Sequence, residues 1–210
     1  MVVGVSDYDY VPALPSAVLD ASLIGASFMS LGFRTSIMIN VTKRNFLRGL
    51  ARFRTKAADA SLAVTYVAAH GTMLNGQGHV FLSDSQHLED RVPESVILQA
   101  VNDKPRQKIL FLDTCRESPI LGAAPSTGLD QYRAGIHVSY ATQPNAPAID
   151  GDDGHSPYAK ALQNALEIPG LHMSEINRRV RLSVLRETHG LQIPWERSSL
   201  VLPVILNSGS

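Results

Sequence analysis

The chain has 210 residues, 44% of them hydrophobic, and its 19 basic side chains balance its 19 acidic ones. A chain of this length can bury a sizeable core, so we expect one domain over residues 1–210, which could be trimmed from a longer protein. The balance of charge leaves no overall field that would attract nucleic acid or an anionic membrane, and neither is expected as a partner.

Three features bear on the compartment. No apolar run approaches the roughly 20 residues that cross a bilayer, and the N-terminus lacks the basic and apolar segments of a signal peptide. The only cysteine, Cys115, cannot form an internal disulfide. Together they favour a reducing cytoplasm.

The first third of the chain alternates between strand and helix. Residues 1–5 are apolar and β-prone, and a helix with apolar side chains at helical spacing is expected from Ser16 to Gly32. A strand over residues 33–39 follows, and Thr42 begins a second helix. The basic residues of that helix would mostly face solvent, and no function is assigned to them: Lys43, Arg44, Arg48, Arg52, Arg54 and Lys56.

Two apolar runs follow, each typical of a strand buried on both faces. The first covers residues 61–68 and leads into His70, and the second covers residues 108–112 and leads into Cys115. Between them, a small hairpin arm is expected near residues 76–82 and a helix over residues 94–101.

The last third again alternates. A strand is expected over residues 136–141, and Ser156 followed by Pro157 predicts a capped helix start. Ser174 is expected to cap another helix, and residues 199–206 to form the last strand. Alternation throughout predicts an α/β fold with a mostly parallel sheet and helices on both faces.

In such sheets reactive groups gather at the carboxyl ends of the strands. His70 and Cys115 would then emerge at the same edge if their strands are neighbours. A nearby imidazole can convert a thiol to the attacking thiolate or take its proton. The backbone N–H groups of Gly71 and Cys115 could hold the oxyanion of a tetrahedral intermediate.

Simpler interpretations stay open for both residues. A lone cysteine is often a small buried hydrophobe, and a lone histidine is often part of a core. The two motifs together favour catalysis, since no other histidine has such a partner. No cysteine cluster or HExxH pattern supports a metal site, and no cofactor is expected.

At this point the sequence resembles the caspase-like cysteine peptidases, and most of all the bacterial group beside the metacaspases and paracaspases. The resemblance implies a caspase-like three-layer sandwich with a six-stranded, mostly parallel sheet and an antiparallel last strand. It also implies a Cys115–His70 dyad with no obligatory third member. The segments that carry it cover nearly the whole chain in the family's order: residues 66–71 (YVAAHG), 109–116 (ILFLDTCR), 139–142 (SYAT), 148–151 (AIDG), 156–158 (SPY) and 188–194 (THGLQIP).

The resemblance also bears on specificity. Animal caspases, which cut after Asp, carry Gln two residues before the cysteine, whereas this chain carries Asp113. Asp20 lies where metacaspases and paracaspases carry a pocket acid, and Asp150 closes a paracaspase-like segment. We therefore expect these three acids to form an acidic S1 pocket that takes Arg first and Lys second.

Each acid also has a simpler interpretation. Asp20 could be an exposed helix residue, Asp113 could cap the turn that follows it, and Asp150 could belong to a solvated turn. Asp152 and Asp153 could bind calcium as acidic loops of some metacaspases do, but their spacing does not support it.

The chemistry implied is cleavage of a protein or peptide substrate after a basic residue. The competing hypotheses are a catalytically silent caspase-like scaffold or zymogen that acts by binding proteins, and an unrelated α/β enzyme that uses Cys115. A regulatory domain or activator protein could be a further partner. The Gly/Pro/Ser-rich stretch at 117–133 lies where relatives are processed, so Arg116 or Arg133 could be a self-cleavage site.

Overall fold

The computed structural model describes residues 1–74, 76–100, 107–117, 134–151 and 153–209. Within these ranges a six-stranded sheet runs through the centre, in the order β2-β1-β3-β7-β8-β9. All neighbouring strands are parallel except β8 and β9. The strands are β1 (Val2–Gly4), β2 (Ile37–Ile39), β3 (Leu62–Ala68), β7 (Gln107–Asp113), β8 (Ile136–Tyr140) and β9 (Trp195–Ser198).

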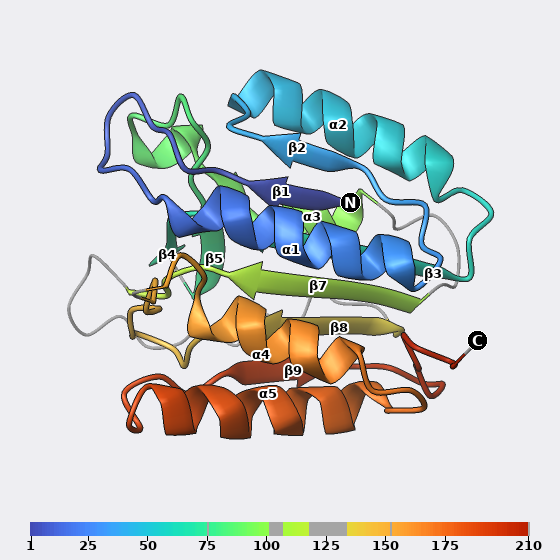
Figure 1. The fold of residues 1–210 in the computed structure, drawn as a ribbon. Coiled ribbons are helices and arrows are strands. Elements are labelled where there is room, and N and C mark those ends of the chain that lie inside the picture. Colours follow the sequence, from blue (N-terminus) through green and yellow to red (C-terminus); the bar gives the residue numbers. More distant parts are fainter. Residues whose placement is uncertain (75, 101–106, 118–133, 152, 210) are drawn as a thin grey trace.

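Helices cover both faces of this sheet (Figure 1). On one face lie α1 (Ser16–Ser30), α4 (Pro157–Leu166) and α5 (Met173–Glu187). On the other lie α2 (Lys43–Lys56) and α3 (Glu94–Gln99). The expected α/β three-layer sandwich is therefore confirmed.

A second, antiparallel sheet forms the predicted arm. It consists of β4 (Gly71–Leu74), β5 (Gln77–Val80) and β6 (Val92–Pro93), with a short 3-10 helix, η1 (Leu88–Asp90), before its last strand. Its buried Val80 and Val92 pack into the same core as α2 and α3.

Strand alternation divides the core in two. In β3, Val64 and Tyr66 point toward α1, α4 and α5, whereas Val67 points toward α2 and α3. In β7, Phe111 and Leu112 alternate in the same way. This alternation explains the near-continuous apolar runs in the sequence, because both faces of each strand are covered.

The helix starts follow local chemistry. Ser156 caps α4, since its Oγ accepts a hydrogen bond from the Ala159 N–H at 2.9 Å. Thr42 caps α2 in the same manner through the N–H of Asn45. Ser174 does not cap α5, because the helix already begins at Met173 and His172 takes the cap position.

The predicted last strand at residues 199–206 was wrong. The strand that pairs with β8 is β9, whose sequence Trp-Glu-Arg-Ser is polar after the exposed Trp195. Residues 199–206 form only an isolated bridge between Ile205 and His172, while Val204 and Leu206 are buried in the core. The apolar side chains there serve packing against the helices, not strand pairing.

Candidate active site

The two proposed catalytic residues leave adjacent parallel strands at the same level. The register pairs Ala68 at the end of β3 with Asp113 at the end of β7, an offset of 45 residues. The same offset separates His70 from Cys115, so each lies two residues beyond its strand. Both residues line one pocket at this carboxyl edge of the sheet.

Gly71 brings the two motifs into close contact. A Cβ atom at Gly71 would lie 2.6 Å from the Cβ of Thr114 and 2.7 Å from the carbonyl oxygen of Cys115. Only a residue without a side chain fits there. The segment after His70 therefore packs directly on the segment that carries the thiol.

The imidazole of His70 is oriented by the loop between β1 and α1. Its Nε2 lies 2.9 Å from the carbonyl oxygen of Pro12, and its backbone N–H donates to the Tyr8 hydroxyl at 2.9 Å. A carbonyl only accepts hydrogen bonds, so Nε2 carries the proton of the neutral ring and Nδ1 has the free lone pair. Nδ1 is thus the nitrogen that can act as a base.

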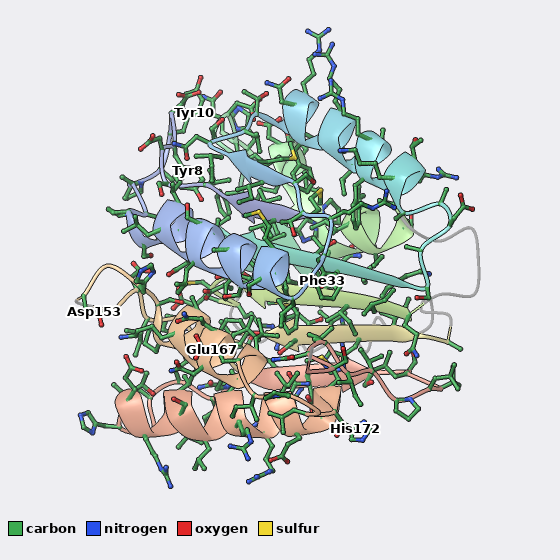
Figure 2. All side chains as sticks on the ribbon, turned by 45° about the vertical axis from the view of Figure 1, so that its right-hand side comes forward. Tyr8, Tyr10, Phe33, Asp153, Glu167 and His172 are labelled. Atoms are coloured by element: carbon green, nitrogen blue, oxygen red, sulfur yellow. The ribbon has the colours of Figure 1, made fainter. Side chains whose placement is uncertain are left out.

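The loops at the carboxyl edge of the central sheet come together at one end of the molecule. Tyr8, in the loop after β1, and Asp153, in the loop before α4, lie at that end, whereas His172 lies at the opposite one (Figure 2). Tyr8 also packs against the imidazole, with 4.9 Å between the His70 and Tyr8 ring centroids.

The thiol of Cys115 is half-buried and engaged by the chain across the pocket. The N–H of Ala148 donates to Sγ at 3.3 Å, and the Ala148 carbonyl lies 3.8 Å from the same sulfur. Burial raises the pKa of Cys115, with smaller contributions from nearby acids, although the Ala148 N–H opposes the shift. Among the hydrogen bonds of the described residues, none joins Sγ to the His70 ring.

Gln192 holds the segment that covers the thiol. Its Oε1 accepts from the N–H of Ile149 at 2.9 Å, and its Nε2 donates to the carbonyl of Ala141 at 2.8 Å. Gln192 is fully buried, so it links the end of β8 to the segment around Ala148 from within.

The predicted acids surround the same pocket, whose volume is about 60 Å³. Asp20 on α1 and Asp113 at the end of β7 are buried, and Asp150 lies exposed at the mouth. The structure thus brings Asp20, Asp113 and Asp150 together around Cys115 and His70.

The two buried acids have strong internal partners. Asp113 Oδ2 accepts from Ser156 Oγ at 2.7 Å and from the Tyr66 hydroxyl at 2.8 Å. Burial, and after it the charge of nearby Asp20, raises the pKa of Asp113 to about 7. Asp113 does not cap the turn after it, because both of its hydrogen bonds go to other elements.

Asp20 has a partner that the sequence did not reveal. His155 Nδ1 lies 2.8 Å from Asp20 Oδ1, and the backbone N–H of Ser156 donates to both carboxylate oxygens. Burial raises the pKa of Asp20, and the bonds to His155 and Ser156 oppose that shift. His155 and Ser156 come from the loop before α4, and only the SPY segment hinted at their position.

Two other sequence expectations can be compared with the structure. Arg116 is buried and stacks on the Tyr140 ring, 4.0 Å from its centroid, so it is not an exposed cleavage site in the folded chain. Arg133 lies outside the described residues, as does Asp152 of the proposed calcium loop.

In the part of the chain that is described, no three His, Cys, Asp or Glu side chains are grouped to hold a metal ion. Nor does that part contain a helix long and apolar enough to span a membrane.

Comparison with known structures gives the same fold. The crystal structure of caspase-1 from Spodoptera frugiperda superposes with a TM-score of 0.74 at 14% sequence identity, covering 98% of this chain and 87% of the other. A search of curated proteins finds no match. The sequence model of the caspase domain matches residues 1–205. The chain therefore belongs to the caspase domain family of cysteine peptidases.

Proposed function

We propose that this chain is a cysteine endopeptidase that cleaves protein or peptide substrates after a basic P1 residue, Arg in preference to Lys. The observation that carries this proposal is the position of two buried acids, Asp20 and Asp113, in the pocket lined by Cys115 and His70. A planar guanidinium can be held by two carboxylates at once, whereas an ammonium binds as a single charge.

Asp113 has room for such a ligand. Both of its internal hydrogen bonds go to Oδ2, and within the described residues Oδ1 has no hydrogen-bond partner. A substrate cation at Oδ1 would favour the ionised form of Asp113 and relieve its repulsion with Asp20. Asp150 at the pocket mouth would add a third negative charge to the same site.

The proposed reaction uses His70 as an acid and a base in turn. The Cys115 proton moves to Nδ1 of His70 as Sγ attacks the scissile carbonyl carbon. The N–H groups of Gly71 and Cys115 hold the oxyanion. The tetrahedral intermediate expels the amine, which takes the proton from the imidazolium, and a thioester remains on Sγ. Water then attacks the thioester with His70 as base, and the acid product leaves as the thiol is restored.

Substrate entry requires the covering segment to move. A pocket of about 60 Å³ is small for an arginine side chain, and the Ala148 N–H donates a hydrogen bond to the Cys115 sulfur. A substrate carbonyl placed against Sγ would replace this contact. We propose that an activator or regulatory domain could move this segment. We propose further that the reaction needs no resident cofactor. The enzyme would act in the cytoplasm, where a lone thiol stays reduced.

A second function has its own support. A silent caspase-like scaffold or a resting zymogen would have a protonated, covered thiol, and burial raises the pKa of Cys115 while Ala148 contacts its sulfur. The scaffold would bind proteins without turnover.

The test is an assay of the purified chain on matched fluorogenic peptides with Arg, Lys or Asp at P1, with Cys115→Ala as control. Cleavage after Arg that is absent in the control supports the proposal. Cleavage after Asp would disprove the acidic pocket and leave the dyad standing. No cleavage, with or without calcium, favours the scaffold or zymogen.

A further inference from the structure

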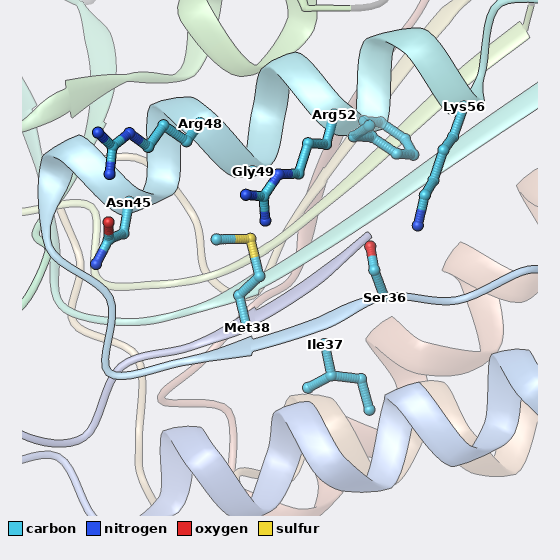
Figure 3. A pocket seen from close by; sticks show the side chains of 9 residues that line it. Ser36, Ile37, Met38, Asn45, Arg48, Gly49, Arg52 and Lys56 are labelled. Atoms are coloured by element: carbon cyan, nitrogen blue, oxygen red, sulfur yellow. The ribbon is translucent and has the colours of Figure 1, made fainter.

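The basic stripe of α2, defined here as Arg48, Arg52 and Lys56, faces a groove on the far edge of the central sheet. The groove has a volume of about 310 Å³ and lies between α2 and the edge strand β2. Figure 3 shows the side chains of Arg52 and Lys56 pointing from the helix toward the strand, with Met38 pointing up from the strand toward the helix at Gly49. The groove is separate from the proposed active site, which lies at the carboxyl ends of β3 and β7.

The stripe is regular and unneutralised. Its three residues are exposed and follow one another at four-residue intervals, which places them about 6 Å apart along the helix. Across the described parts of the chain none of the three forms a salt bridge. An unpaired row of cations over a groove makes a local positive potential that attracts negative charge.

The strand beneath the stripe has an open edge. Val2 donates to the carbonyl of Ser36, and Asn40 donates to the carbonyl of Gly4, so alternate residues of β2 bond to β1. The backbone groups of Ile37 and Ile39 therefore point away from the sheet. Along the described chain, no strand pairs with this side of β2.

The groove also has an apolar floor and side. Gly49 lets α2 approach the strand, since a Cβ there would overlap the end of the Met38 side chain. On the opposite face of the strand, the side chains of Ile37 and Ile39 are each 39% exposed.

We propose that this groove binds an extended acidic segment of a partner protein, which adds to the sheet as a strand beside β2. Alternate residues of a strand are about 6.6 Å apart, close to the spacing of the stripe. Acidic side chains at every second position would meet Arg48, Arg52 and Lys56. The side chains between them would lie on the opposite face, beside Ile37 and Ile39, and would be apolar.

The open backbone edge favours a peptide over other polyanions. A nucleic acid or a lipid surface could pair with the cations, but neither supplies the N–H and C=O groups that complete a β-ladder. The balanced charge of the whole chain also gives little general attraction to a nucleic acid.

The test uses the Cys115→Ala chain and a fluorescein-labelled peptide, Glu-Val-Glu-Val-Glu-Val-Glu, followed by fluorescence anisotropy. We expect saturable binding that Arg52→Glu weakens by about tenfold or more. Arg186→Glu, the same charge change at an exposed position of α5, should stay within about twofold. Thermal melts of both variants check that they fold.

Two further probes test the mode of binding. Two peptides would be N-methylated, one at the odd-numbered amides and the other at the even-numbered amides. Only one of the two should lose binding, because only one set of N–H groups faces β2. Equal binding of all methylated peptides would overturn the strand addition. Tighter binding of a duplex oligonucleotide or of phosphatidylserine vesicles would overturn the choice of ligand. Absence of any binding would show that the stripe is a solvated face.

Discussion

His155 lies against the buried carboxylate of Asp20, with 2.8 Å between Nδ1 and Oδ1. The imidazole is about one-third exposed, whereas the carboxylate is almost completely buried. The partly exposed imidazole of His155 therefore binds Asp20, one of the acids of the pocket that is proposed to hold the substrate cation. In the proposed function, His155 competes with the P1 side chain.

Removal of this competitor should improve binding. We expect His155→Ala to lower KM for Arg-P1 peptides about threefold to tenfold with little change in kcat, because Asp20 Oδ1 loses its imidazole partner and keeps only the longer bond from the Ser156 N–H. Steady-state kinetics on Arg and Lys peptides would measure it. His189→Ala, at an exposed position just beyond α5, is the matched control. An unchanged KM in the His155 variant would mean that Asp20 does not contact the substrate.

Asp113 should make both stability and substrate binding depend on pH. The folded state raises its pKa to about 7 from an ordinary value of 3.8, so the folded chain keeps a proton that the unfolded chain loses. Stability should therefore fall as the pH rises from about 4 to 7, by on the order of 3 kcal/mol. Urea unfolding of the wild type and of Asp113→Asn across this range would show it, since the variant should lack this slope.

The same group sets a kinetic signature. Only ionised Asp113 attracts a guanidinium, so KM for Arg peptides should fall as the pH rises through about 7. In Asp113→Asn, KM should be raised and should lose this pH dependence. A wild-type KM that stays constant between pH 6 and 8 would count against Asp113 as a pocket residue.

Gly71 should tolerate no side chain. Gly71→Ala places a methyl within 2.7 Å of the Cys115 carbonyl, a backbone atom that cannot move away by a rotamer change. We expect a loss of about 1–3 kcal/mol in unfolding free energy and a fall of about 100-fold in kcat/KM, as the thiol shifts. In the control, Gly49→Ala, the methyl meets the flexible end of Met38, so activity should remain. Wild-type kinetics in Gly71→Ala would refute the close packing.

The covered thiol should react slowly until its cover is released. Burial raises the pKa of Cys115, so at pH 7.5 we expect iodoacetamide to label it no faster than free cysteine. Gln192→Ala removes the bond that holds Ile149 and should speed labelling several-fold. Gln163→Ala, on the outer part of α4, should leave the rate as it was. Fast labelling of the wild type would contradict a resting, protonated thiol.

The fold and the placement of His70 and Cys115 in one pocket could be predicted because local signals determine them. Two apolar runs on neighbouring strands end in His70 and Cys115, and their 45-residue spacing equals the register offset of the strands. The last strand could not be predicted in this way. An edge strand such as β9 is defined by backbone pairing, and its mostly polar sequence gives no run of apolar residues.

The surroundings of the site were harder to predict. His155, Gln192 and Tyr8 reach it from loops that are distant in sequence, and tertiary packing alone brings them there. Asp20 and Asp113 were found only through family resemblance, since nothing in their local sequence separates a buried acid from an exposed one. Their roles in substrate binding stay predictions.

The bond between His70 Nε2 and the carbonyl of Pro12 has a consequence for genetics. The group that fixes the tautomer of the proposed base belongs to the main chain, so every amino acid at position 12 supplies it. An alanine scan of this chain would test the thiol and the imidazole and would pass over the oxygen that orients the imidazole. Selection can therefore change the side chain at that position freely, provided that the course of the loop after β1 is kept.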